Sequence, residues 1–290
     1  MTRFGEPVIP SGEFEHVFEG ERLYSGRSEF QKIDVYEHEH FGRVLTLDDL
    51  VQTTQTDEFC YHEMLVHPAL ASREPERVLV IGGGDGGTLR HVLMHGVASA
   101  VMCEIDGEVV RVSRELMPML SEGAFEDPRA ELVIGDGAAY VASHDGEFDA
   151  ILVDSTDPIG AATVLFSDEF YADCRRALKP DGVLVSQTGS PMYQGTEFRM
   201  ALGNMRAAFD TVETYLGFVP TYPGVLWSFT SGTSGPPLSQ TPREDIDARL
   251  RARAIDARFY SPDGHAAAFA LPPFVRELCE SAAPTPVPRG

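Results

Sequence analysis

Five acidic side chains stand at the ends of short apolar segments in this sequence, or directly after them. They are Asp85, Glu104, Asp136, Asp154 and Asp157. In an open parallel sheet, ligands bind in the crevice beyond the carboxyl ends of the strands. The sequence therefore predicts a crevice lined by carboxylates, which could bind hydroxyls or cations and take up protons.

A glycine loop, residues 82–87, follows the apolar segment 77–81 and precedes a segment with helical spacing. Glu104 comes 22 residues after Gly82, a distance typical of an acidic residue that binds the hydroxyls of an adenosine ribose. The pattern fits a dinucleotide enzyme, an S-adenosylmethionine enzyme, or a tight turn without a ligand.

Asp85 distinguishes among these alternatives because it places a carboxylate inside the loop. A pyrophosphate would bind the backbone amides there and would be repelled by this charge. The amino-acid carboxylate of S-adenosylmethionine would be repelled in the same way. The residues thus favour a sulfonium nucleoside without that carboxylate, such as decarboxylated S-adenosylmethionine.

Asp154 and Asp157 lie three residues apart after the fourth apolar segment of the series. Such a pair can simply form an Asx turn or cap a helix. It can also serve catalysis, because an alkylammonium titrates near pH ~10 and must lose a proton before it attacks a sulfonium carbon. One carboxylate could take that proton while the other binds another charge of the substrate.

Alternating strands and helices must position these residues. We predict an α/β fold, a Rossmann-like methyltransferase-type domain with a mainly parallel sheet, preceded by a small N-terminal β domain. The division is 1–70, which includes a linking helix at 57–71, and 71–290. Predicted strands are 77–81, 100–106, 130–136, 148–154, 182–187 and 211–215, and predicted helices are 88–95, 107–116, 167–178, 197–209 and 243–254. Residues 231–237 are predicted as a loop, and the tail after Ala282 as frayed.

The amino-acid composition excludes several classes of protein and partner. The 290 residues contain 45 Asp and Glu against 23 Lys and Arg, a formal charge of -22, so nucleic acid and anionic membrane are poor partners. Most of these acids are expected on a solvated surface. The four cysteines are far apart, which predicts neither a zinc cluster nor a disulfide framework. No secretion signal or long apolar run is present, and we expect a cytoplasmic protein.

The chain resembles the polyamine aminopropyltransferases, the spermidine synthase family, over roughly residues 14–275. Five stretches look like motifs of that family in the expected order. They are Leu47-Asp-Asp-Leu-Val-Gln-Thr-Thr-Gln-Thr-Asp-Glu-Phe-Cys-Tyr-His-Glu-Met, Val80-Ile-Gly-Gly-Gly-Asp-Gly-Gly, Ile134-Gly-Asp-Gly, Val153-Asp-Ser-Thr-Asp-Pro-Ile-Gly and Pro220-Thr-Tyr-Pro.

The resemblance implies transfer of an aminopropyl group from decarboxylated S-adenosylmethionine, a co-substrate, to an amine, usually putrescine, without a metal or redox cofactor. It implies Asp154 as the base. It also implies donor contacts from Gln31, Gly82, Gly84, Asp85, Glu104, Asp136 and Gly137, and acceptor contacts from Tyr61, His62, Asp85, Asp154, Asp157, Gln187 and Tyr222. A purely structural role is the alternative for three of these residues. His62 could be a histidine whose hydrogen bonds are satisfied within its helix, Tyr222 could pack in the core, and Gln31 could only pair within a strand.

The sequence departs from the family pattern at two places that bear on which substrates bind. Ala161 stands where the family usually has proline, and the tryptophan often found near the N-terminus is missing, since Trp227 is the only one. Agmatine or a triamine thus remains an alternative acceptor, and a methyltransferase that uses intact S-adenosylmethionine remains a competing function. Because the N-terminal β unit is too small to bury both faces alone, we expect a homodimer or homotetramer.

Overall fold

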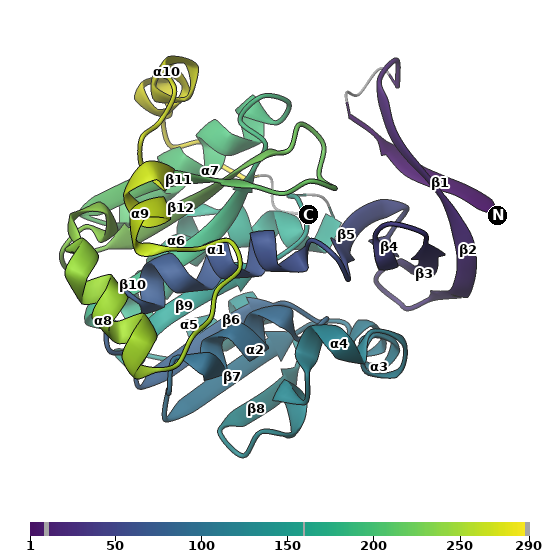
Figure 1. Cartoon of the computed structure of the whole chain (residues 1–290). Coiled ribbons are helices and arrows are strands. Elements are labelled where there is room, and N and C mark those ends of the chain that lie inside the picture. Colours follow the sequence, from purple (N-terminus) through teal and green to yellow (C-terminus); the bar gives the residue numbers. More distant parts are fainter. Residues whose placement is uncertain (9–11, 159, 288–290) are drawn as a thin grey trace.

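The computed structural model describes residues 1–8, 12–158 and 160–287 and contains two β-sheets (Figure 1). Ile159, which belongs to a family motif, and the side chain of Ala161 lie outside the described part. The N-terminal sheet is antiparallel throughout and has the order β1-β2-β3-β4-β5. Its strands are β1 (Thr2–Pro7), β2 (Glu15–Arg27), β3 (Lys32–His38), β4 (Gly42–Leu47) and β5 (Leu50–Thr54). The predicted small β unit is present, and β1 extends it toward the N-terminus.

The second sheet has seven strands in the order β11-β12-β10-β9-β6-β7-β8. All pairings from β10 to β8 are parallel, whereas β12 runs antiparallel to both of its neighbours. The predicted Rossmann-like, mainly parallel sheet is thereby confirmed. The strands are β6 (Arg77–Gly82), β7 (Ser99–Glu104), β8 (Ala130–Ile134), β9 (Phe148–Asp154), β10 (Leu178–Gly189), β11 (Thr211–Phe218) and β12 (Leu226–Thr233).

Helices cover both faces of this sheet because its strands are apolar on both sides. Val78 and Val80 of β6 face one core, and the alternate residues Leu79 and Ile81 face the other. The first core is covered mainly by α1 (Glu58–Leu70), α2 (Gly87–Met94), α8 (Arg243–Ala252) and α9 (Pro262–Ala268), and the second by α5 (Gly137–Ala142), α6 (Asp168–Ala177) and α7 (Gly195–Ala208). The remaining helices are α3 (Gly107–Leu116), α4 (Pro118–Ser121) and α10 (Pro273–Ser281), with short 3-10 turns at Ala124–Glu126, Gly160–Phe166 and Leu238–Gln240.

Helix α1 leads from the small sheet into the core of the large one (Figure 1). The division predicted from the sequence groups this linking helix with the N-terminal unit. In the structure Leu65, Val66 and Leu70 are fully buried in the first core, and the Tyr215 hydroxyl donates to the Met64 carbonyl at 2.9 Å. Because nearly all of its residues are buried, the helix requires the large sheet as its packing surface.

Two predictions near the C-terminus are wrong. Residues 231–233, predicted as a loop from their small polar side chains, complete strand β12, where buried hydroxyls pair with one another, as Thr230 does with Thr188 and Thr214. The tail predicted to fray after Ala282 is held, within its described part 283–287, by Asn204, which accepts a hydrogen bond from the Thr285 amide and donates one to the Thr285 carbonyl. The last three residues of that prediction, 288–290, lie outside the described residues. Side-chain partners distant in sequence stabilise both segments.

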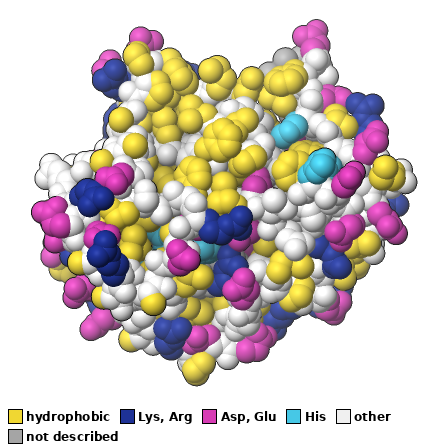
Figure 2. Space-filling view, viewed as in Figure 1, with side chains coloured by type: hydrophobic (Ala, Val, Ile, Leu, Met, Phe, Trp, Pro, Cys, Tyr) yellow, Lys and Arg dark blue, Asp and Glu magenta, His cyan; other side chains and the backbone are white. Residues whose placement is uncertain are grey.

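The surface has the composition expected of an acidic protein. Figure 2 shows acidic side chains spread around the edge of one face, with basic side chains (Lys and Arg) among them and a concentration of hydrophobic side chains in its upper part. No helix within the described ranges has the length and apolar character needed to cross a membrane.

Candidate active site

Two neighbouring cavities lie where the carboxyl ends of the large sheet meet the small sheet. The first has a volume of about 250 Å³ and is lined by twelve of the thirteen predicted site residues: Gln31, Tyr61, His62, Gly82, Gly84, Asp85, Glu104, Asp136, Gly137, Asp154, Asp157 and Tyr222. The second, of about 280 Å³, is lined by the thirteenth, Gln187, and by some residues of the first. Tyr61, Asp157 and Tyr222 belong to both walls. The structure therefore brings all predicted residues together around one connected site.

The glycine loop approaches the end of β9 too closely for a side chain. Gly82 has a φ of 82°, and a Cβ there would lie 2.1 Å from the Asp154 carbonyl oxygen. The Gly83 amide donates to the same carbonyl at 2.9 Å. At Gly84 a Cβ would lie 2.8 Å from Val109 Cγ1. Gly82 is thus needed to bring the loop backbone against Asp154, and Gly84 to bring it against Val109.

Asp154 is held by two hydroxyl donors. Tyr61 donates to Oδ1 at 2.9 Å, and Thr88 donates to Oδ2 at 2.6 Å. Burial raises the pKa of Asp154 and the negative charge of Asp85 adds to this, while His62 and the two hydroxyls act in the opposite direction. An oriented carboxylate with a raised pKa is suited to accept a proton from an amine. Thr88 was not predicted, although its place after the glycine loop could have suggested it.

His62 connects Asp85 to a buried ion pair. Its Nε2 lies 3.6 Å from Asp85 Oδ1, and its Nδ1 lies 2.6 Å from Glu58 Oε2. Burial alone would lower the pKa of His62, but the two carboxylates raise it well above its usual value. Arg90 lies 2.7 Å from the other Glu58 oxygen. His62 is therefore a charged link between Asp85 and Glu58, and its contact with an acceptor remains a prediction. Glu58 was missed by the sequence analysis.

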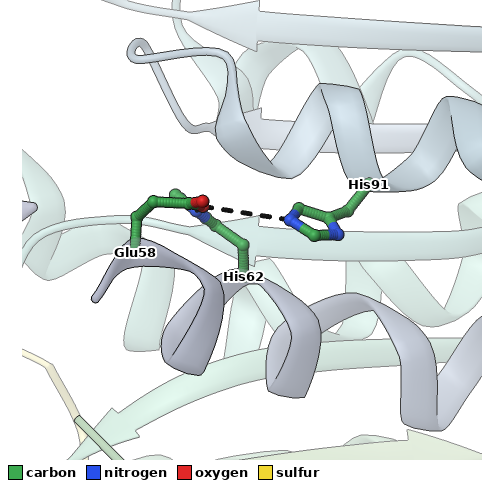
Figure 3. A group of neighbouring side chains, drawn as sticks. All are labelled: Glu58, His62 and His91. Atoms are coloured by element: carbon green, nitrogen blue, oxygen red, sulfur yellow. Dashed lines mark hydrogen bonds and ion pairs between the residues drawn. The ribbon is translucent and has the colours of Figure 1, made fainter. Parts of the chain in front are cut away.

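Glu58 and His62 on α1 face His91 on α2, and Figure 3 shows the three side chains pointing toward one another. Their donor atoms lie close enough to hold a metal ion. However, Arg90 also lies 3.0 Å from His91 Nε2, and with His62 it occupies both oxygens of Glu58. A dication would compete with the arginine and with a charged histidine, so these residues suit an ion pair better than a metal.

Carboxylates at the ends of β7 and β8 line the other side of the first cavity. Glu104 Oε1 accepts a hydrogen bond from the Asp106 amide at 2.8 Å, and burial raises the pKa of Glu104 to about 7. Asp136 caps α5, because its Oδ1 accepts from the amides of Ala138 and Ala139. Both side chains lie where an adenosine could contact them, and their ligand roles remain predictions.

Gln31 reaches this cavity from the small sheet. Its Nε2 donates to Asp106 Oδ2 at 3.0 Å, and Asp106 in turn caps α3 by accepting from the Glu108 amide. The side chain of Gln31 therefore joins the small sheet to helix α3, which follows β7. This contact is not a pairing within a strand. Asp106 is 1% exposed and was not predicted, although an Asp directly before the helix at Gly107 is a typical N-cap.

Asp157 lies on the turn after β9, at the wall between the two cavities. Its Oδ2 accepts from Gln194 Nε2 at 2.5 Å, and burial raises its pKa. Gln187 donates to the carbonyls of Ser155 and Thr156 at 3.1 and 3.4 Å. Gln187 thus supports the turn that carries Asp157, and its direct contact with an acceptor remains a prediction. Gln194 was not predicted.

Tyr222 belongs to a loop that is fixed to strand β5 and to the linker after it. Its ring lies against Tyr61 and Trp227, with centroid distances of 5.7 and 4.6 Å, and its hydroxyl donates to the Gln52 carbonyl. The neighbouring residue, Thr221, donates through its amide and its hydroxyl to Asp57 Oδ2. Tyr222 therefore packs in an aromatic group and also forms part of the cavity wall.

Two family models match this chain in succession. The one described as spermidine synthase tetramerisation domain matches residues 20–55, and the one described as spermine/spermidine synthase domain matches residues 58–240. The first match falls on the small sheet, and the second begins at the first residue of α1.

Curated relatives and solved structures agree with these matches. The polyamine aminopropyltransferase of Ruegeria sp. (strain TM1040) is 46% identical over 260 residues, which cover 89% of this chain and 92% of that protein. Polyamine aminopropyltransferase 1 of Pseudomonas aeruginosa is 46% identical over 87% of this chain and 89% of its own length. A spermidine synthase crystallised with the transition-state analogue AdoDATO superposes with a TM-score of 0.91 at 40% identity, covering 96% of this chain and 95% of that one. The spermidine synthase of Thermotoga maritima gives 0.88 at 38% identity, with 96% and 94% covered.

Proposed function

The chain belongs to the spermine/spermidine synthase family, and we propose that it transfers the aminopropyl group of decarboxylated S-adenosylmethionine to putrescine, which gives spermidine and methylthioadenosine. One observation carries the proposal most directly. Asp154 is oriented by two hydroxyls and lines the same cavity as Asp85. Tyr61, Asp157 and Tyr222 line both this cavity and a second one, in which an amine could bind.

The transfer is a direct displacement at carbon. The acceptor amine enters protonated and gives a proton to Asp154, which frees its lone pair. That lone pair forms the new C–N bond at the methylene carbon beside the sulfonium, while the C–S bond breaks and its electrons remain on sulfur. The sulfonium thereby becomes the neutral thioether of methylthioadenosine. Tyr61 and Thr88 keep the Asp154 oxygens oriented for the proton transfer.

In this proposal Asp85 binds the aminopropyl ammonium of the donor. One of its oxygens accepts from the Gly87 amide at 2.7 Å, at the start of α2, and charged His62 lies behind it. At the other end of the cavity, Glu104 would accept from the ribose hydroxyls, and Asp136 and Gly137 would contact the adenine. A carboxylate on the donor would face Asp85, which supports the decarboxylated donor over intact S-adenosylmethionine.

Putrescine would lie between Asp154 and Asp157, with its chain against the rings of Tyr61 and Tyr222. These rings form a continuous aromatic wall. Aromatic faces and carboxylates together attract an aliphatic dication.

The proposal extends to cofactors and assembly. The displacement moves no electrons to or from a redox centre, and a carboxylate is a sufficient base, so we propose that it needs no metal or cofactor beyond its co-substrate. The match of the small sheet to a tetramerisation domain supports a homo-oligomer. We propose that the enzyme acts in the cytoplasm.

The test is an assay of the purified chain with decarboxylated S-adenosylmethionine and putrescine, with the products identified by mass. Formation of spermidine and methylthioadenosine in equal amounts is the expected result. Transfer of a methyl group from intact S-adenosylmethionine, or no turnover with any amine, would contradict the proposal.

A further inference from the structure

Charged side chains of alternating sign extend from the first cavity to the surface across the contact between α1 and α2. Asp85 lines the cavity, His62 follows at 3.6 Å, and Glu58 lies 2.6 Å from the other nitrogen of that imidazole. Arg90 pairs with Glu58 at 2.7 Å and with Glu122, whose side chain is exposed, at 3.0 Å. Among the described residues of this series, Asp85 and His62 alone line the cavity. The carboxylate proposed to bind the donor is therefore connected to charges that a ligand does not touch.

His62 has a fixed place between its two carboxylates. Its ring packs on the first residue of α2, since a Cβ on Gly87 would lie 2.2 Å from the imidazole Cε1. Nε2 faces Asp85 and Nδ1 faces Glu58. Burial opposes the charge of the ring, but Asp85 and Glu58 raise the pKa of His62 well above its usual value. One imidazolium is thus shared by two carboxylates.

His91, which faces Glu58 and His62 in Figure 3, adds no second imidazolium. Its Nε2 lies 3.0 Å from Arg90, and this nitrogen must accept because a guanidinium has no acceptor. Burial lowers the pKa of His91, which agrees with a neutral ring. The other titratable groups around the pair are two neutral rings, Tyr61 against His62 and His67 against His91, and the carboxylate of Asp154, which acts on His62 from the end of β9.

The charge of Glu58 decides how much of the charge of Asp85 is left for a ligand. While Glu58 shares the imidazolium, Asp85 keeps negative charge toward the cavity. Without that second carboxylate, His62 would pair with Asp85 alone, and a donor ammonium would compete with the imidazolium for it. Arg90 acts in the opposite sense because its positive charge offsets part of the charge of Glu58.

We propose that Glu58 and Arg90 set the preference for decarboxylated over intact S-adenosylmethionine from outside the cavity, with Glu58 as the positioning residue that shares the imidazolium of His62. This inference rests on the proposed function. The ammonium of the decarboxylated donor would continue the alternation of charges beyond Asp85, whereas the carboxylate of the intact donor would interrupt it. Donor choice then depends on the contact between two helices as well as on the carboxylate in the cavity.

The experiment measures the preference as the ratio of the dissociation constants of the intact and the decarboxylated nucleoside, by calorimetry at neutral pH. Glu58→Gln should lower this ratio about fivefold or more, and Arg90→Gln should raise it about twofold or more, since the two changes remove charges of opposite sign. Glu58→Asp, which keeps the charge, should retain most of the preference. Methylthioadenosine, which has neither charged group, should bind all these proteins alike, so a general loss of structure is recognised.

Glu122→Gln is the matched control, because it removes the exposed partner of the same arginine and should leave the preference unchanged. A second measurement needs no nucleoside. In an NMR titration of the His62 imidazole, assigned by its loss in His62→Gln, the wild-type ring should stay protonated up to pH ~8. In Glu58→Gln its pKa should fall by about one pH unit or more.

Three results would overturn the inference: an unchanged preference in Glu58→Gln, a lowered preference in Arg90→Gln, or the fall expected of Glu58→Gln appearing in Glu122→Gln. If Glu58→Gln does not fold, Arg90→Gln decides, and a preference that does not rise there refutes the inference. A wild type that prefers the intact nucleoside or turns over no amine contradicts the proposed function instead, while the change between variants still tests Glu58. If neither nucleoside binds, the His62 titration decides, and an equal pKa in wild type and Glu58→Gln is the refuting result.

Discussion

The imidazole Nε2 of His62 lies 3.6 Å from Asp85 Oδ1, so the carboxylate proposed to bind the donor ammonium already has a buried cation behind it. The two residues come from different elements: His62 lies within helix α1, and Asp85 lies in the loop before α2. Asp85 is therefore fixed in place beside a buried cation before any ligand arrives. This arrangement predicts that Asp85 decides which sulfonium nucleoside binds.

Replacing Asp85 with Asn should reduce the preference for the decarboxylated donor over intact S-adenosylmethionine at least tenfold, or about 1.4 kcal/mol. The amide keeps an oxygen for the Gly87 amide but loses the charge that attracts an ammonium and repels a carboxylate. Calorimetry with both nucleosides measures the ratio. Methylthioadenosine, which has neither charged group, should bind wild type and variant alike. An unchanged ratio would remove Asp85 from donor selection.

Asp154→Asn should lower kcat by about 10²–10⁴-fold, the usual contribution of a positioned base, with little effect on donor affinity. Asparagine preserves the shape of the side chain but cannot accept the ammonium proton. Single-turnover measurements with saturating substrates report this step. Asp145→Asn, a change of an exposed aspartate just before β9, is the control. A loss of less than tenfold would rule out the base role.

Tyr61→Phe should move the acidic limb of the kcat/KM profile to higher pH. The Tyr61 hydroxyl stabilises the ionised form of Asp154, so its removal raises the pKa of Asp154 further, and the base is then protonated over a wider range. Thr88→Val should act in the same direction because it removes the other donor. Tyr222→Phe, whose hydroxyl bonds to a backbone carbonyl, is the matched control. A shift toward lower pH in Tyr61→Phe is the contrary result.

Glu104→Gln should stabilise the ligand-free protein at pH 8 by up to about 3 kcal/mol and should weaken donor binding. The folded-state pKa of Glu104, about 7, is above its usual value of 4.5, so the folded protein binds more protons than the unfolded chain between these values. The stability that this group contributes is full below pH ~4.5 and is lost as the pH rises through 7. Denaturant unfolding at pH 5 and pH 8 measures the difference, which should fall to about a quarter at pH 5. An equal effect at both pH values would contradict the burial argument.

The sequence predicted the parts of the site that depend on local patterns. The spacing from Gly82 to Glu104 and the positions of Asp85, Asp154 and Asp157 after apolar segments were sufficient to place these residues at one edge of a parallel sheet. Gln31 was implied only by the family resemblance.

Residues that arrive through long-range pairing could not be predicted in this way. Glu6 reaches the second cavity because β1 and β5 belong to one sheet, and its hydrogen-bond partner Val51 is 45 residues away. Arg90 and Glu58 meet only because α1 packs on α2, and no spacing within either helix encodes that contact. The error at residues 231–233 has the same origin, since the hydroxyls of Ser231 and Thr233 reach the carbonyls of Glu213 and Gly182 only after the sheet is assembled.

The bonds of Asp57 have a consequence for local unfolding. One of its oxygens accepts from Thr54, at the end of the small sheet, and the other accepts from both the amide and the hydroxyl of Thr221, which is 164 residues from Asp57. Because one buried carboxylate binds both segments, neither segment can unfold locally without breaking its hydrogen bonds to Asp57. In hydrogen exchange, the amides of the 219–222 loop and of the linker after β5 should therefore open as a single unit, so that the acceptor wall and the linker between the sheets lose protection together.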